Sequence, residues 1–194
     1  MAFPKRLIIA LSGASGPIVG IRLLERMKAL PAWETHLVLS EGARRTILEE
    51  TGYTVADVEA LATVVHAQED IGASIASGTF KVAGMVVAPC SMKTLAGVAH
   101  GFSENLILRA ADVTLKERRR LVLVPREMPL SLIHLRNMTA ATEAGAILLP
   151  PMLSFYQQPK TVDGLIDHVV GKILDLFEIE MPGFYRWQES NEGQ

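Results

Sequence analysis

The apolar stretches of this chain are short and almost continuous, and they do not alternate strictly between apolar and polar residues. They cover Leu7–Leu11, Thr35–Leu39, Met85–Ala88, Leu121–Val124 and Ile147–Leu149. A strand that is apolar on both faces is buried on both faces, which is typical of a parallel sheet lying between two layers of helices. The pattern therefore predicts five strands in the interior of an α/β protein.

Helical patterns separate these stretches. Ile18, Ile21, Leu24 and Met27 recur at helical spacing, and the segment Val162–Phe177 keeps one apolar stripe over about four turns. We expect further helices from Ser40 toward Glu50, near Val55–Leu61, a short one near Ile71, and over Lys93–Ala99, Asn105–Glu117 and Leu130–Ala144. This alternation predicts a three-layer, doubly wound, Rossmann-like fold whose loops after the strands gather at one sheet edge.

The length of 194 residues favours a single domain, which we place over residues 1–188, with residues 189–194 as a disordered tail. Apolar residues make up 49% of the chain and the mean hydropathy is +0.25. A small domain this apolar is expected to hide surface against copies of itself, and a sedimentation experiment that finds a monomer would contradict that expectation.

Charge and cysteine content narrow the possible partners and compartment. The formal net charge of -2 offers no general attraction for nucleic acid or an anionic membrane, so we expect neither partner. Cys90 is the single cysteine, which excludes an internal disulfide and suits a reducing compartment. No apolar run approaches the roughly 20 residues of a membrane span. We therefore expect a cytoplasmic protein.

The first loop of interest, Gly13-Ala14-Ser15-Gly16, lies between a strand and a helix. Small residues there let backbone N–H groups approach a phosphate or a flat ring. A tight strand-to-helix turn needs the same residues, and the G-x-G spacing of the dinucleotide motif is missing. Pro17 suits the first turn of the helix, with Ser15 or Gly16 as its cap.

A second loop, Ser91–Thr94, follows the third strand and contains two hydroxyls and the Lys93 ammonium. These groups at a helix start are suited to hold a phosphate, although simple helix capping explains them equally well. Cys90 precedes the loop, and a nucleophilic role is disfavoured because no histidine lies near it in sequence.

Charged residues mark two further positions. Arg109, Asp112 and Lys116 share one narrow face of an otherwise apolar helix. This face points either to water or to a crevice or subunit contact where an anion binds. Arg126 and Glu127 lie in a loop bounded by prolines after the fourth strand. A carboxylate fixed there beside a cation could move a proton, but a surface turn with a local ion pair is an equal alternative.

Several motifs are missing. The histidines form no metal-ligand spacing with one another or with Cys90, there is no P-loop, and there is no Asp-rich cluster for magnesium on a pyrophosphate. We therefore expect no metal, and a ligand with a single phosphate that side chains and amides bind directly.

Taken together, these segments resemble one family over nearly the whole chain, namely the flavin prenyltransferases, or UbiX/Pad-type flavoproteins. The matching segments, in order, are Gly13–Gly16, Arg109–Asp112, Leu115–Arg118, Leu121–Glu127 and Ile133–Leu135. The Ser-Met-Lys-Thr sequence at residues 91–94 resembles the branch paired with aromatic-acid decarboxylases, where many ubiquinone-pathway members have Ser-Thr-Gly-Thr.

The resemblance implies a metal-independent reaction within a single flavin-binding domain. The dimethylallyl group of dimethylallyl monophosphate would be joined to N5 and C6 of reduced FMN. The product, prenylated FMN, would serve a separate UbiD-type decarboxylase. The family forms homo-oligomers, namely dodecamers with active sites at subunit contacts, so the same assembly is expected here.

The resemblance also implies roles for individual residues. FMN would be held by Gly13, Ala14, Ser15, Ser40, Ser91, Met92, Lys93, Thr94 and Arg126. The prenyl phosphate would be held by Arg109, Lys116, Glu127, Tyr156 and Lys172, with Trp187 near the prenyl group. Ser15, Glu50, Lys116 and Glu127 are the residues expected to take part in the chemistry, with Ser15 near flavin N5 and both glutamates handling protons.

Two alternatives remain open. One is a non-catalytic FMN-binding accessory subunit of an aromatic-acid decarboxylase. The other is a flavin-dependent decarboxylase of cysteine-containing substrates, which is disfavoured because His66 lies in no recognisable motif. A nicotinamide-dependent dehydrogenase is weakened by the missing G-x-G-x-x-G sequence.

Overall fold

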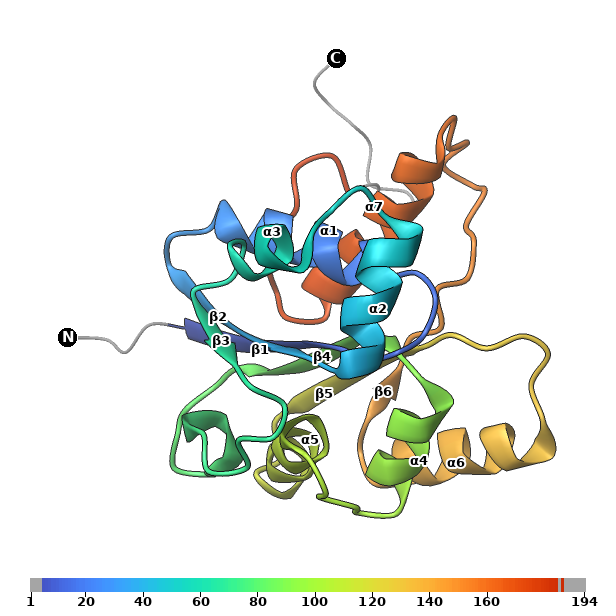
Figure 1. Ribbon diagram of the computed structural model, residues 1–194. Coiled ribbons are helices and arrows are strands. Elements are labelled where there is room, and N and C mark those ends of the chain that lie inside the picture. The colour runs from blue at the N-terminus through green and yellow to red at the C-terminus, as the bar shows by residue number, and fades with distance from the viewer. Residues whose placement is uncertain (1–4, 185, 187–194) are drawn as a thin grey trace. The chain divides into compact units, whose positions relative to one another are not determined.

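The computed structural model describes residues 5–184 and 186, and the chain divides after Pro151 into two compact units. The first unit contains a six-stranded sheet in the order β3-β2-β1-β4-β5-β6 (Figure 1). All neighbouring strands are parallel. The strands are β1 (Lys5–Leu11), β2 (Trp33–Leu39), β3 (Val64–His66), β4 (Gly84–Cys90), β5 (Arg120–Pro125) and β6 (Ile147–Leu148). The strand order reverses between β1 and β4, and doubly wound sheets bind ligands at such a point.

Helices cover both faces of this sheet (Figure 1). On one face lie α1 (Ile18–Lys28), α2 (Glu41–Glu50) and α3 (Val55–Glu59), and on the other lie α4 (Met92–Ala99), α5 (Leu106–Lys116) and α6 (Leu132–Glu143). The second unit contains α7 (Val162–Asp175). The predicted doubly wound, three-layer fold with a parallel sheet is confirmed. The expected single domain over residues 1–188 stays a prediction, and residues 189–194 lie outside the described part of the chain.

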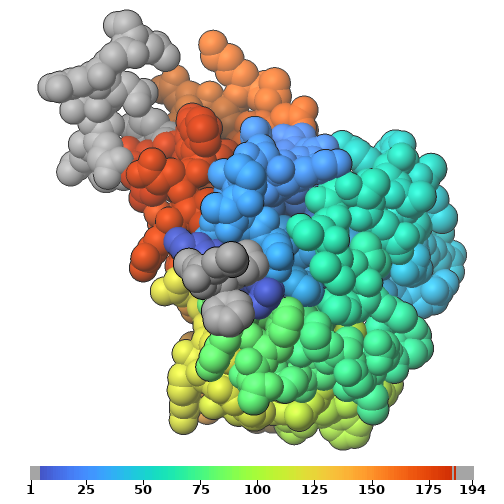
Figure 2. Space-filling view, turned by 90° about the vertical axis from the view of Figure 1, so that its left-hand side faces the viewer, coloured from blue at the N-terminus to red at the C-terminus, as the bar shows by residue number. Residues whose placement is uncertain are grey.

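The segment between α3 and β4 differs from the expectation. It contributes the strand β3, which sequence reasoning missed, and the predicted short helix near Ile71 is instead a 3₁₀ turn, η1 (Ser74–Ala76). β3 has only three residues, and its Val64 and Val65 are 37% and 41% exposed. A strand this short and this exposed gives neither an apolar run nor an alternating pattern. Figure 2 shows this segment, in teal and green, as part of the surface of the first unit.

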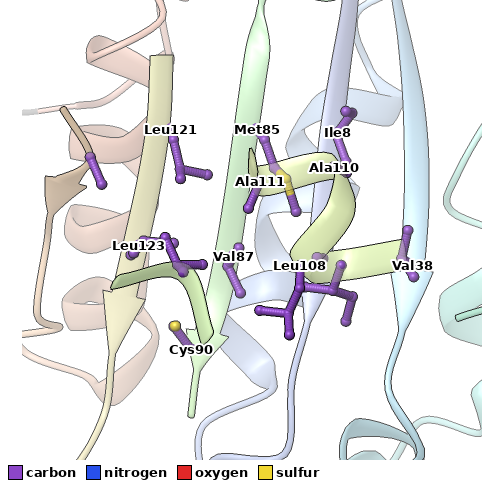
Figure 3. Close-up of a cluster of buried hydrophobic side chains, with 14 of the residues drawn as sticks. Ile8, Val38, Met85, Val87, Cys90, Leu108, Ala110, Ala111, Leu121 and Leu123 are labelled. Carbon is purple, nitrogen blue, oxygen red and sulfur yellow. The ribbon is translucent and has the colours of Figure 1, made fainter. Parts of the chain in front are cut away.

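The core on the α4–α6 face fixes the geometry of the sheet edge. Met85 and Val87 of β4 lie beside Leu121 and Leu123 of β5, and residues of α5 belong to the same buried cluster (Figure 3). All four side chains are completely buried, and burial of each contributes roughly 1.5–3 kcal/mol. The strand ends that follow this core are therefore held in fixed positions.

No helix among the described residues is long and apolar enough to cross a bilayer.

Candidate functional site

A cavity of about 340 Å³ lies at the carboxyl edge of the sheet, where loops following β1, β2, β3 and β4 meet the start of α5. Its volume falls in the usual range for small-molecule sites. Five of the residues predicted to bind FMN line it, namely Gly13, Ser40, Ser91, Lys93 and Thr94. The structure thus brings together loops that are distant in sequence, at the point where the strand order reverses.

Two glycines bring the walls of this cavity into contact. A Cβ atom on Gly13 would lie 3.0 Å from the Cα of Gly42, and one on Gly42 would lie 2.9 Å from the Cα of Gly13. Real Cβ atoms are rarely this close to a backbone atom, so both positions depend on a missing side chain. The loop after β1 and the first turn of α2 therefore meet backbone to backbone.

A third loop is joined to the first through the hydroxyl of Ser12. This hydroxyl donates to the carbonyl oxygen of Pro89 at 3.1 Å and accepts from the N–H of Ser91 at 2.8 Å. Ser12 is buried, so the two hydrogen bonds are shielded from water. In the same turn, the N–H of Ala14 donates to the Ser12 carbonyl at 2.7 Å.

The hydroxyls predicted to hold a phosphate also cap helices. Ser40 begins α2 by accepting the N–H of Ala43 at 3.0 Å, and Ser91 begins α4 by accepting the N–H of Thr94 at 3.3 Å. The Ser91 hydroxyl also donates to the Thr94 hydroxyl at 3.1 Å. Capping and ligand binding are therefore compatible here, because the caps line the cavity and the positive ends of both helices favour an anion.

Ser15 and Glu50 meet at one side of the first loop. The Ser15 hydroxyl donates to Oε2 of Glu50 at 3.0 Å, and the N–H of Gly16 donates to the same oxygen at 2.8 Å. The prediction that Ser15 or Gly16 caps the first helix is wrong, because α1 begins at Ile18 after Pro17 without a side-chain cap. The hydroxyl of Ser15 contacts a carboxylate instead.

Arg126 and Glu127 follow β5 at the same edge. The N–H of Arg126 donates to the carbonyl oxygen of Cys90 at 3.2 Å, which joins this loop to the end of β4. Glu127 accepts the N–H of Met128 at 3.0 Å, and both charged side chains are exposed. Cys90 is fully buried, and burial raises the pKa of its thiol to about 12, so it is unsuited to act as a nucleophile.

The two residues of α5 that are predicted to bind the prenyl phosphate, Arg109 and Lys116, lie toward opposite ends of the helix. Arg109 pairs with Asp112 at 2.9 Å, near the end of α5 that lines the cavity through Leu108. Lys116 follows Leu108 by eight residues, or about 12 Å along the helix axis, and pairs with Glu117 at 2.6 Å. This contact with Lys116 lowers the pKa of Glu117. Within one chain, Lys116 is therefore not brought to this cavity.

The remaining predicted residues are placed as follows. Met92 is half-buried at the start of α4 and packs against the core cluster. Tyr156 and Lys172 belong to the second unit, where the Tyr156 hydroxyl lies 3.1 Å from Nε2 of His168 and Lys172 donates to Asp175 at 2.8 Å. Trp187 lies outside the described residues.

Sequence reasoning missed seven of the residues that line the cavity, among them the polar residues Gln68 and Asn105. The side-chain oxygen of Gln68 accepts the N–H of Glu41 at 3.2 Å, and its carbonyl oxygen accepts the N–H of Leu106 at 2.8 Å. Gln68 thus connects the first residues of α2 and α5. It follows β3, so missing that strand also hid this loop. Asn105 caps α5 and was expected only as part of that helix.

No group of three or more His, Cys, Asp or Glu side chains suited to a metal ion occurs among residues 5–184 and 186. The strand order and the cavity define this chain as a ligand-binding α/β protein of the doubly wound class. Comparison with known proteins identifies the family within that class.

The pattern of the Flavoprotein family matches residues 2–176. A probable UbiX-like flavin prenyltransferase of Streptomyces sp. (strain D7) is 58% identical over 94% of this chain and 91% of its own length. Flavin prenyltransferase UbiX of Thauera aromatica is 54% identical over 96% of both chains. The chain therefore belongs to the Flavoprotein family, among its UbiX-type flavin prenyltransferases, and the resemblance expected from the motifs is confirmed.

Two solved structures agree with this assignment. A dodecameric FMN-dependent UbiX-like decarboxylase from Escherichia coli O157:H7 is 51% identical, with a TM-score of 0.93, over 95% of this chain and all of that chain. AnUbiX (PadA1) in complex with FMN and dimethylallyl pyrophosphate is 49% identical, with a TM-score of 0.94, over 97% of this chain and all of that chain.

Proposed function

We propose that this flavin prenyltransferase transfers the dimethylallyl group of dimethylallyl monophosphate to N5 and C6 of reduced FMN, with release of phosphate and without a metal. The observation that supports this most directly is the cavity at the carboxyl edge of the sheet, whose wall carries the hydroxyls of Ser40, Ser91 and Thr94, together with the Ser15–Glu50 pair in the loop after β1. The relatives named as flavin prenyltransferases support the same activity.

The residues present suit FMN. Ser40, Ser91 and Thr94 offer hydroxyls beside the starts of α2 and α4, and Lys93 adds a positive charge, so this part of the cavity suits the phosphate of FMN. The contact between Gly13 and Gly42 leaves backbone exposed to the cavity, as a flat ring requires. When bound, reduced FMN supplies the two nucleophilic atoms of the reaction.

Ser15, Glu50 and Glu127 are the groups that we propose to handle protons. Glu50 holds the Ser15 hydroxyl in one orientation through its carboxylate. Glu127 lies at the same sheet edge, in the loop whose Arg126 N–H donates to the carbonyl oxygen of Cys90. Carboxylates fixed near a reacting group can accept or deliver a proton.

Arg109, Lys116, Glu127, Tyr156 and Lys172 are proposed to bind the prenyl phosphate, where their cations would stabilise the leaving phosphate. Because Lys116 lies away from the cavity of its own chain, we propose that copies of the chain complete one another's sites in a homo-oligomer. The dodecameric E. coli relative supports a dodecamer. Exposed apolar side chains around the start of α6, namely Met128, Leu132 and Ile133, also support association.

A UbiD-type decarboxylase of an aromatic acid is the proposed recipient of prenylated FMN, on the basis of the Ser-Met-Lys-Thr sequence at residues 91–94. A cytoplasmic location belongs to the same proposal, since a chain with a single cysteine suits a reducing compartment.

The direct test incubates the purified protein with FMN, dithionite and dimethylallyl monophosphate and measures the mass of the flavin. We expect a gain of one dimethylallyl group, and an unchanged flavin would favour an accessory FMN-binding subunit. Glu127→Gln is expected to abolish the gain while FMN remains bound. Glu143→Gln, at an exposed position at the end of α6, is the matched control. A fully active Glu127→Gln variant would remove Glu127 from the chemistry.

A further inference from the structure

Two carboxamide side chains, those of Gln68 and Asn105, line the cavity beside the starts of α2 and α5. Oε1 of Gln68 accepts the N–H of Glu41, the first residue of α2, at 3.2 Å. Oδ1 of Asn105 caps α5 by accepting the N–H of Leu108 at 3.1 Å. Both side chains are half-buried. Each carboxamide is thus attached to the start of one helix through its oxygen.

These two hydrogen bonds fix which branch of each amide is the oxygen. A backbone N–H needs an acceptor, and only the oxygen of a carboxamide can accept. The NH2 groups of Gln68 and Asn105 therefore occupy the other branch of each side chain. Neither NH2 group donates a hydrogen bond to any of residues 5–184 and 186. Each residue therefore offers N–H donors to a ligand in the cavity.

Amides rather than carboxylates occupy both positions, although a carboxylate would hold the helix starts equally well. Aspartate caps a helix as effectively as asparagine, and a negative charge at the start of a helix interacts favourably with the helix dipole. What a carboxylate lacks is the N–H donor. The identity of Gln68 and Asn105 is therefore explained by what the side chains can donate and by their neutrality.

The charges on the cavity wall give that neutrality a purpose. Among the described residues that line the cavity, Lys93 and Glu41 are charged, and their formal charges cancel. The further attraction for an anion comes from hydroxyls, N–H groups and the starts of α2, α4 and α5. A carboxylate in place of either amide would make the wall negative, opposite a phosphate monoester that carries about 1.5 to 2 negative charges near pH 7.

We propose that Gln68 and Asn105 donate hydrogen bonds from their NH2 groups to the phosphate of FMN, and that they select this phosphorylated flavin over riboflavin. The inference rests on the proposed function, because it takes FMN to be the ligand of this cavity. It extends the phosphate site from the hydroxyls of Ser40, Ser91 and Thr94 to the wall formed by α5 and the loop after β3. Because the oxygens of both amides are already bound to helix starts, the donors are in place before FMN arrives.

Gln68→Glu and Asn105→Asp test this inference, because each keeps the oxygen that accepts from a helix and replaces the NH2 group by a negative charge. The hydrogen bond from Leu106 to the main-chain carbonyl of Gln68 does not depend on the side chain. We expect each variant to raise the Kd for FMN roughly tenfold or more, and to leave the Kd for riboflavin, which has no phosphate, unchanged. Quenching of flavin fluorescence measures both constants. The melting temperature of the flavin-free protein should not fall, because both anchoring bonds remain.

Further variants separate the lost donor from the added charge. Asn105→Ser keeps a capping hydroxyl without a negative charge, and it is expected to weaken FMN binding less than Asn105→Asp does. Ala32→Asp adds the same charge in the exposed turn before β2, at the opposite edge of the sheet, and should bind FMN normally. If Gln68→Glu fails to fold, Gln68→Met replaces it, with the same expectation for FMN and for riboflavin.

Two results would overturn the inference. One is a normal Kd for FMN in both Gln68→Glu and Asn105→Asp. The other is an equal rise in the Kd for FMN and for riboflavin, which would show that the two amides only shape the cavity. Neither result contradicts the proposed function if the unaltered protein adds a dimethylallyl group to FMN, whereas an unchanged flavin mass with the unaltered protein would refute that function itself.

Discussion

The hydroxyl of Ser15 and the carboxylate of Glu50 are joined by a 3.0 Å hydrogen bond between the loop after β1 and the last residue of α2. The same carboxylate oxygen accepts the N–H of Gly16. The loop that lines the cavity is therefore attached to a helix on one face of the sheet. Two groups proposed to take part in proton transfer thus lie in direct contact.

Glu50→Gln is predicted to slow prenylation without weakening FMN binding. Glutamine keeps an oxygen that can accept both hydrogen bonds but loses the carboxylate that can take up a proton. We expect kcat to fall about 100-fold, measured by the appearance of prenylated FMN. Glu49→Gln is the matched control, since the neighbouring Glu49 pairs with Arg45 on the helix surface. A Glu50→Gln variant with normal kcat would show that Glu50 only holds the loop.

Gly13→Ala is predicted to weaken FMN binding. The added methyl group would lie 3.0 Å from the Cα of Gly42, so the loop after β1 and the start of α2 must move apart. Overpacking of this kind costs about 1–3 kcal/mol, which corresponds to an increase in the Kd for FMN of roughly 5- to 150-fold if the whole cost falls on the bound state. Quenching of flavin fluorescence measures the Kd. Gly52→Ala is the control, because a Cβ atom there has open space; equal Kd values for the two variants would contradict the prediction.

Lys116→Ala is predicted to raise the KM for dimethylallyl monophosphate and to leave that for FMN unchanged. Since Lys116 lies at the end of α5 away from the cavity of its own chain, its effect should occur in the site of a neighbouring copy. Assemblies that mix Lys116→Ala and Glu50→Gln chains should then be more active than either variant alone. Lys81→Ala is the control, because the charge of Lys81, like that of Lys116, lowers the pKa of Glu117. Equal changes in both KM values would move Lys116 out of the phosphate site.

The His36–His66 pair predicts how stability depends on pH. His36 is 4% exposed and its Nδ1 lies 2.9 Å from Nε2 of His66. Burial, and then the nearby His66, lower the pKa of His36 to about 4. The unfolded chain, whose histidine pKa is about 6.5, therefore binds the proton first as the pH falls. The contribution of neutral, buried His36 to the free energy of unfolding is fully present above about pH 6.5. It is lost as the pH falls toward 4, by an amount on the order of 3 kcal/mol.

Urea denaturation at about pH 7.5 and about pH 4.5 measures this loss. His36→Gln should lose less stability on acidification than the unaltered protein, because it has no imidazole to protonate. His100→Gln, at an exposed position, should keep the full loss. If all three proteins respond alike to acidification, the pair does not govern the pH dependence.

The fold was largely predictable because buried parallel strands have a distinct composition. Leu7–Leu11 and Leu121–Val124 are apolar throughout and lie within β1 and β5, with every one of these residues buried. β3 escaped prediction because its stability comes from pairing with β2, which a local pattern does not record. The predicted cap of α1 was wrong for a related reason. The Ser15 hydroxyl donates to Glu50, which is distant in sequence, and a local pattern does not record such a contact.

The candidate site was predictable only in part. Residues directly after strands, such as Ser40 and Ser91, could be placed because parallel strands end at one edge. The contact between Gly13 and Gly42 depends on how closely a loop and the start of α2 approach, and no spacing within either segment indicates it. The separation of Lys116 from the cavity follows from the direction of α5, which the charged pattern on that helix does not reveal.

The outermost strands of the sheet, β3 and β6, contain three and two residues. They present too few unpaired backbone groups to act as a template for a strand from another molecule. The homo-oligomer that we propose would therefore assemble through side chains on helices and loops. Such an assembly would carry little risk of open-ended, amyloid-like stacking.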